Sequence, residues 1–250
     1  MILEVASLTD PGRVRPNNED SFGQFGPSND DEEGTTGWLF VVADGMGGHR
    51  GGEIASALAV KTIESSYYAD TGPSRSAALK LAVEGANRLI LEEAISNPSL
   101  TGMGTTCTAM AVHDGFAYFV HVGDSRAYVL RESEFVQLTQ DHSLVGEMVR
   151  SGILSDEDAR NHPKRNVITR SLGVQSTVVA DTPFTPFKLE QNDVFVLCSD
   201  GLTSMVDDAE IAELASGNTP SNATKMLVNL ANQRGGKDNI TAVVVKVAEL

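Results

Sequence analysis

The sequence predicts an α+β fold in which antiparallel β-sheets carry helices on their outer faces. Three observations support this prediction. Short apolar runs rich in Val, Phe and Tyr are typical of strands, and loops rich in Gly, Asp, Asn and Thr separate them. These runs follow one another directly more often than they alternate with helical segments, which favours antiparallel over doubly wound parallel sheets. Neither a fixed-period repeat nor a long low-complexity linker divides the 250 residues, so we expect one domain over residues 1–250.

The expected elements follow from local patterns along the chain. Strands are expected within four apolar stretches, namely 38–44, 107–130, 193–200 and 240–247. Inside the second stretch, His113-Asp114-Gly115 separates two apolar runs and signals a hairpin turn. Helices are expected where apolar residues recur at helical spacing, over 53–68, 75–96 and 223–233. Residues 141–173 are polar and poor in strand pattern, so we expect an insertion or a lid there.

Composition and charge narrow the class of protein. Hydrophobic residues make up 41% and charged residues 21%, which is ordinary for a soluble globular chain. The net charge of −15 argues against a nucleic-acid-binding surface, which needs a basic stripe. The first ten residues lack the pattern of a signal peptide, and no apolar run is long enough to cross a membrane. Cys107 and Cys198 lie in apolar stretches and are expected to be buried thiols. We therefore expect a reduced, cytoplasmic protein without membrane insertion, and no pattern requires more than a monomer.

Acidic residues spread over the whole chain occupy positions suited to a metal site. Most stand beside an apolar run and a Gly or a turn, which places a carboxylate at the end of a buried strand. They are Glu19, Asp20, Asp44, Asp124, Asp200 and Asp238. Carboxylate oxygens without nearby His or Cys suit hard cations such as Mg²⁺ and Mn²⁺. Such a site, with open coordination positions, is equipped to hydrolyse a phosphate ester.

Each motif also has an ordinary interpretation when taken alone. Asp44-Gly45 could be a simple turn, as Asp114-Gly115 is expected to be, and Asp124 could mark a tight bend between strands. A guanidinium four residues before Glu19 could bind phosphate oxygens bidentately. That group belongs to Arg15, but Arg13 lies only two residues away, and the sequence does not decide between them.

The ordered set of motifs resembles the metal-dependent protein phosphatase 2C family, in the compact bacterial form that opposes Ser/Thr kinases. The motifs are VRPNNED, ADGMGGHRGGE, GMGTTCTA, HVGDSRAY, TQDHS, HPKRNVITRSLG, VLCSDGL and KDNIT. The resemblance implies a four-layer α-β-β-α sandwich of two antiparallel sheets flanked by helices, with a dinuclear centre between the sheets at one end. It also implies hydrolysis of phosphoserine and phosphothreonine in proteins by a water that two Mn²⁺ or Mg²⁺ ions activate.

The same resemblance implies a role for each residue of the two-metal core. Asp44 corresponds to the ligand that bridges the two ions, and the carbonyl of Gly45 lies beside it. Glu19 corresponds to a ligand of one ion, and Asp200 and Asp238 correspond to ligands of the other.

Further roles are implied around this core. Asp20 corresponds to an outer partner that acts through metal-bound water. Asp124, together with Asp200, corresponds to the ligands of a third ion that is typical of bacterial members. Arg15 corresponds to the arginine that binds the substrate phosphate, and residues 141–173 correspond to a mobile flap beside the site.

One position departs from the family pattern. Animal members carry a His two residues after the bridging Asp as a proposed general acid, and here that residue is Met46. A serine or threonine alkoxide leaves poorly without a proton. His49 and metal-bound water are the two candidate donors, while His162 is better explained as a flap-positioning residue. Neither cysteine lies in a basic, Gly-rich phosphate loop, which argues against a Cys-nucleophile phosphatase.

Three other functions compete with this interpretation. A non-catalytic phosphoprotein-binding module would have lost acidic positions, and none is missing. A specialised phosphatase for a single phosphorylated regulator would carry an added sensor or coiled coil. An acidic cation-binding protein without chemistry would not explain the ordered motifs. The basic group Lys164, Arg165 and Arg170 could attract phosphorylated segments or could simply be a solvated surface.

Overall fold

The computed structural model describes residues 1–26, 36–47, 51–183 and 185–250. Two sheets face each other, and every strand pair within them is antiparallel. The first sheet has the order β1 (Ile2–Asp10), β11 (Ile240–Glu249), β10 (Val194–Cys198), β7 (Arg126–Arg131) and β8 (Glu134–Gln137). The second has the order β2 (Asp20–Phe25), β3 (Trp38–Met46), β5 (Cys107–His113), β6 (Phe116–Val122) and β9 (Phe187–Lys188), with β4 (Gly104–Thr105) paired to β3.

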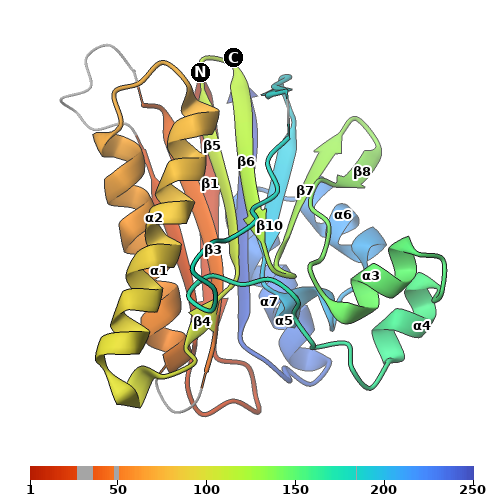
Figure 1. Cartoon of the computed structure of the whole chain (residues 1–250). Coiled ribbons are helices and arrows are strands. Elements are labelled where there is room, and N and C mark those ends of the chain that lie inside the picture. The colour runs from red at the N-terminus through yellow and green to blue at the C-terminus, as the bar shows by residue number, and fades with distance from the viewer. Residues whose placement is uncertain (27–35, 48–50, 184) are drawn as a thin grey trace.

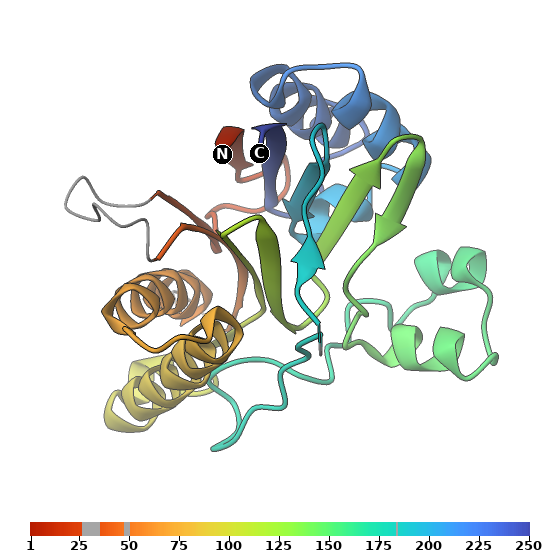
Figure 2. The same ribbon diagram turned by 90° about the horizontal axis from the view of Figure 1, so that it is seen from above.

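Helices cover the outer face of each sheet, as Figures 1 and 2 show. The long helices α1 (Gly51–Ala69) and α2 (Arg75–Ser96) pack on the second sheet. The helices α6 (Asp208–Ser216) and α7 (Pro220–Gln233) pack on the first sheet. The remaining helices are short and are η1 (Pro98–Leu100), α3 (Leu144–Arg150), α4 (Asp156–Asn161) and α5 (Asp200–Thr203). The predicted four-layer α-β-β-α sandwich is confirmed.

Side-chain alternation along the strands explains the layers. In β3, Leu39 and Val41 join the core beneath α1 and α2, whereas Phe40 and Val42 join the core between the two sheets. Successive side chains of a strand point to opposite faces, so a strand covered on both faces reads as a continuous apolar run. This is why the run at 38–44 was recognisable as a buried strand.

Most predicted elements lie where the sequence placed them. Helix α2 coincides with its predicted range of 75–96, and α7 begins three residues before its predicted start. Thr219 caps α7 by accepting from the amide of Asn222, and Pro220 occupies the first turn, where its missing N–H costs nothing. Asp114 and Gly115 both have positive φ in the β5–β6 hairpin, and both cysteines are buried as expected.

Two aspects of the sheets were not predicted. The expected stretches did not include β1 and β2, which form one edge of each sheet, or the short strands β4, β8 and β9. The apolar stretch at 107–130 is three strands, and its last two belong to different sheets. The chain therefore crosses from β6 to β7 through residues 123–125, and Asp124 lies at that crossing. Residues 141–173, called the flap segment below, lie beside the sheets and contain α3 and α4 (Figure 1).

Among the helices of the described ranges, none combines the length and the hydropathy that a membrane span requires.

Candidate metal centre

The strand ends converge at one end of the sandwich, away from the two termini. Asp20 at the start of β2 pairs in register with Asp44 near the end of β3. The backbone amide of Glu19 donates to the side chain of Asn239, which directly precedes β11, at 2.8 Å. Asp200 opens α5 just after β10. Antiparallel pairing thus brings segments from the two halves of the chain to the same edge.

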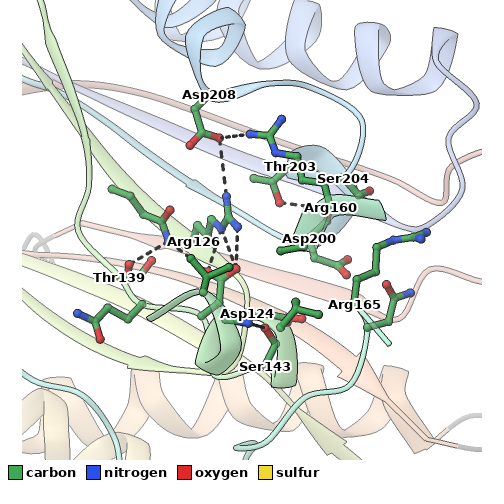
Figure 3. A pocket seen from close by; sticks show the side chains of 18 of the residues that line it. Asp124, Arg126, Thr139, Ser143, Arg160, Arg165, Asp200, Thr203, Ser204 and Asp208 are labelled. Carbon is green, nitrogen blue, oxygen red and sulfur yellow. Dashed lines mark hydrogen bonds and ion pairs between the residues drawn. The ribbon is translucent and has the colours of Figure 1, made fainter. Parts of the chain in front are cut away.

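A cavity of about 340 Å³ occupies this edge. Its lining includes seven of the predicted site residues, namely Arg15, Glu19, Asp44, Gly45, Asp124, Asp200 and Asp238. Asp20 lies behind this lining and is 7% exposed. A second cavity of about 730 Å³ shares Asp124 and Asp200 with the first, and extends between the flap segment and α5 and α6 (Figure 3).

The main chain at Asp44 is held firmly by a buried Thr pair. The amide of Asp44 donates to Oγ1 of Thr106 at 2.9 Å, and its carbonyl accepts from the Thr106 amide and the Thr105 hydroxyl. The side chain points into a group of carboxylates. Burial, followed by repulsion from Asp20 and Asp200, raises the pKa of Asp44 well above its ordinary value.

Asp20 is buried and only half satisfied. Its Oδ2 accepts from the hydroxyls of Ser199 at 2.7 Å and Thr241 at 2.6 Å. Its Oδ1 has no hydrogen-bond partner, and the same is true of Oδ1 of Asp124. Burial raises the pKa of Asp20 to about 7, against the opposing effect of the two hydroxyl donors.

Asp200 and Asp124 are likewise buried beside other carboxylates. Burial and the charge of Asp238 raise the pKa of Asp200 to about 6. Burial and the charge of Asp200 raise the pKa of Asp124 well above its ordinary value. Like charges held together out of water disfavour each other's ionised form, and a nearby cation reverses that effect.

Glu19 approaches the start of α1 so closely that only glycine fits there. A Cβ at Gly52 would lie 2.4 Å from Oε2 of Glu19, and one at Gly45 would lie 2.1 Å from the carbonyl oxygen of Gly52. The Gly45 amide also donates to the Glu19 carbonyl at 3.1 Å. The glycines around Asp44 therefore let a carboxylate, a strand end and a helix start meet at one point.

The structure distinguishes the two arginines that the sequence could not separate. Arg15 lines the cavity, and its Nη2 donates to Oδ2 of Asp238 at 2.7 Å. Arg13 instead uses its backbone amide, which donates to the carbonyl of Gly236 at 2.7 Å. Arg15 is therefore the arginine beside the acidic cavity.

An all-oxygen donor set and two unpartnered buried carboxylate oxygens fit a hard divalent cation. Within the described ranges, however, no group of three or more His, Cys, Asp or Glu side chains is already arranged so that it could hold a metal ion. Part of the reason lies in the contacts above, since Asp238 is paired with Arg15 and Asp20 with two hydroxyls. These carboxylates are gathered but engaged with protein partners.

One predicted residue is not among those the structure describes, and some contributors were missed. His49 falls outside the described residues, and Met46 lines the cavity at the position where animal members carry His. Sequence reasoning missed Ser199, Thr241 and Asn239, whose side chains hold Asp20 and Glu19. Ser199 and Asn239 are adjacent to Asp200 and Asp238, and Thr241 follows Asp238 by three residues, which is the signal that could have found them.

Comparisons with known proteins show the family of this chain. The model of the family "Protein phosphatase 2C" matches residues 17–242. The serine/threonine phosphatase stp of Listeria innocua is 41% identical over 243 residues, covering 95% of this chain and 93% of the relative. The protein phosphatase PhpP of Streptococcus pneumoniae is 37% identical over 251 residues, covering 99% and 98%.

Solved structures give the same result. The serine/threonine phosphatase PstP/Ppp of Mycobacterium tuberculosis superposes with a TM-score of 0.89 at 35% identity, and each chain is covered completely. The catalytic domain of PstP in complex with two manganese ions has a TM-score of 0.84 at 33% identity, with 99% of each chain covered. Because sequence and structure match over almost the whole length, this chain belongs to the protein phosphatase 2C family.

Proposed function

We propose that this chain hydrolyses phosphoserine and phosphothreonine in proteins by direct attack of water, with two Mn²⁺ or Mg²⁺ ions held in the acidic cavity. The enzyme class is protein-serine/threonine phosphatase, metal-dependent like its family, as its family and relatives indicate. The observation that carries the proposal is the gathering of acidic residues from distant segments, together with Arg15, around one cavity.

The proposed ligands follow from the cavity lining. Asp44 would bridge the two ions, with the Gly45 carbonyl beside it. Glu19 would bind one ion, and Asp200 and Asp238 would bind the other. When bound, the cations would lower the pKa of coordinated water and neutralise charge on the phosphoryl oxygens.

Two further carboxylates would act around this pair. Asp20 would orient the ligands from behind, since its Oδ2 is fixed by Ser199 and Thr241 while its Oδ1 is unpartnered. Asp124, with Asp200, would hold a third ion. Asp124 lies where the two cavities meet, which supports a position between the core pair and the incoming substrate.

Arg15 would bind the phosphate of the substrate. Its side chain is 52% exposed, and its guanidinium is held by Asp238 alone among the contacts that the structure gives it. Binding of the substrate would therefore change the partner of Arg15. Its guanidinium would pair with the phosphate, and Asp238 would become free to act as a metal ligand. A guanidinium suits this exchange because it pairs equally well with carboxylate and phosphate.

The leaving serine or threonine oxygen needs a proton. The thioether of Met46 cannot supply one. We propose His49 as the donor, with solvent in the site as the alternative. The two differ in their dependence on the leaving group, since an aryl oxide leaves without protonation far more readily than an alkoxide.

The substrates would be proteins phosphorylated by Ser/Thr kinases, because those kinases create this ester. The cavity of about 730 Å³ beside the flap segment is large enough for residues that flank the phosphorylated side chain. We propose that residues 1–250 act as one domain, that 141–173 work as a flap, and that the enzyme acts as a cytoplasmic monomer.

The decisive test is phosphate release from a phosphothreonine peptide with added Mn²⁺ or Mg²⁺, then with excess chelator, then with the ion restored. Turnover that appears, disappears and returns supports the proposal. If folded protein releases no phosphate with either ion while still binding the peptide, a phosphoprotein-binding module replaces the enzyme.

A further inference from the structure

Two histidines hold the main chain of Gly123 through its amide and its carbonyl. Gly123 lies at the crossing from β6 to β7, directly before Asp124, and has φ of +114°. Its amide donates to Nδ1 of His142 at 3.1 Å. Its carbonyl accepts from the His142 amide at 2.7 Å and from Nε2 of His121 at 3.0 Å. The main chain just before the Asp124 carboxylate is therefore fixed.

The contacts of His142 determine its tautomer. An amide is always a donor, so Nδ1 of His142 accepts from Gly123 and the ring proton lies on Nε2. That proton points to Oδ2 of Asp181 at 3.1 Å. Burial lowers the pKa of His142 despite this contact, which keeps the ring neutral near pH 7. Because Nε2 carries the proton, it cannot accept from Nη1 of Arg170, which lies 3.3 Å away. Nη1 donates instead to Oδ1 of Asp181 at 3.0 Å.

These contacts reach the flap segment. His142 stands at its beginning, and the His142 carbonyl accepts from the amide of Thr169 at 2.7 Å near its end. Ser143 and Ile168 form an isolated β-bridge between the same two segments of the chain. Arg170 continues the line to Asp181, which itself bridges to His121. The two ends of the flap segment are thus tied to the loop that carries Asp124.

His121 differs from His142 in its connections. It is 3% exposed, and its ring is tilted by 37° against that of His142 with the centroids 4.9 Å apart. Its Nδ1 pairs with the hydroxyl of Thr108 and its Nε2 with backbone carbonyls. These contacts reach the sheet, the crossing and the carbonyl of Gln140, just before the flap segment. Among the described residues, only the His142 ring joins Gly123 to the charged pair of Asp181 and Arg170.

We propose that His142 is a positioning residue: by accepting from the Gly123 amide it fixes the Asp124 carboxylate in the cavity, and through Asp181 and Arg170 it ties that position to the end of the flap segment. The inference rests on the proposed function, since it assigns Asp124 a ligand role. Outer partners that orient a ligand typically change metal affinity by about 10- to 100-fold when removed.

Two variants of His142 and one control separate the contact that Nδ1 makes from the contact that Nε2 makes. His142→Leu removes both contacts, whereas His142→Asn keeps an acceptor near the place of Nδ1 and loses the contact to Asp181. His113→Asn, at the far end of β5, is the matched control. We expect His142→Leu to weaken Mn²⁺ binding at the Asp124-dependent site by about 10-fold. We expect His142→Asn to weaken it by less than about 3-fold, and His113→Asn to leave it unchanged. Free Mn²⁺ is measured by its electron paramagnetic resonance signal.

A double variant tests whether the effect passes through Asp124. If it does, His142→Leu causes no further loss of Mn²⁺ binding when Asp124→Asn is already present. Additive losses would overturn the proposal, and so would His142→Asn behaving like His142→Leu.

A measurement on the metal-free protein keeps the inference separate from the proposed function. Amide hydrogen exchange at Gly123 should be faster in His142→Leu and unchanged in His142→Asn, whether or not the wild type binds Mn²⁺ or turns over a phosphopeptide. Wild-type protein without turnover would contradict the phosphatase proposal alone. Unchanged exchange at Gly123 in His142→Leu would overturn the positioning role alone.

Discussion

The guanidinium of Arg15 lies 2.7 Å from the carboxylate of Asp238, although 223 positions separate the two residues in the sequence. The side chains are 52% and 27% exposed, and pairs of this kind contribute between 0 and about 1 kcal/mol to stability. Such a contact is easily exchanged. In the proposed function it would keep the phosphate-binding Arg15 and the metal-binding Asp238 paired until a phosphate and a metal ion replace each partner.

Replacing Arg15 with Ala should weaken phosphopeptide binding far more than it lowers kcat. A hydrogen bond to a charged group is worth about 1.5–3 kcal/mol, so we expect KM to rise by about 10- to 100-fold. Steady-state kinetics on a phosphothreonine peptide measure this. Arg13→Ala is the matched control and should leave KM unchanged, because Arg13 contacts Gly236 through its backbone. Unchanged KM and kcat in Arg15→Ala would remove Arg15 from the site.

Asp44→Asn and Asp200→Asn should each lower kcat by at least about 100-fold while the protein stays folded, because an amide is a poor ligand for a hard cation. Neither change opens a cavity, and both remove a charge from a crowded acidic group. We therefore expect the thermal midpoint of the chelated protein to stay the same or rise. Asp114→Asn provides the control, since Asn tolerates the positive φ of the hairpin turn. Wild-type rates in either site variant would contradict the ligand assignment.

The stability of the metal-free protein should fall as the pH rises from about 4 to about 7. The pKa of Asp20 is raised to about 7 and that of Asp200 to about 6, so in this range the folded state binds more protons than the unfolded state. Stability then decreases with pH, and is highest below the unfolded pKa of about 4. Thermal midpoints in chelator between pH 4.5 and 8 measure this trend, which Asp20→Asn should flatten. A midpoint that rises through this range would contradict the raised pKa values.

Added Mn²⁺ should reverse that trend. A cation that binds only the folded, ionised site stabilises it more as the carboxylates lose their protons. We expect the gain in thermal midpoint on adding Mn²⁺ to be larger at pH 7.5 than at pH 5.5. An equal gain at both values would indicate that the ion binds away from these carboxylates.

Replacing His49 with Ala should slow hydrolysis of a phosphothreonine peptide more than hydrolysis of an aryl phosphate, if His49 protonates the leaving oxygen. The measured quantity is the ratio of the two kcat/KM losses. Equal losses on the two substrates would assign the proton to solvent in the site. His162→Ala, in the flap segment, serves as the control and should not change this ratio.

The sequence by itself determined the elements whose signals are local. The range of α2, the hairpin at Asp114-Gly115 and the buried run of β3 each follow from spacing or turn chemistry within a few residues. Most of the acidic residues could be named for the same reason, since they stand beside an apolar run that had to be buried. Their motifs also carried the family resemblance, which the comparisons confirmed. The roles of these residues as ligands stay predictions.

The tertiary structure decided which residues meet through strand register and through crossings of the chain between the two sheets. It placed Arg15 rather than Arg13 at the cavity, through the contact with Asp238. It showed that the stretch around Asp124 changes sheet, which no periodicity could reveal because both sheets favour the same apolar residues. It also set His142 against Gly123. These relationships join residues far apart in sequence, and only pairing of the strands in three dimensions fixes which of them meet.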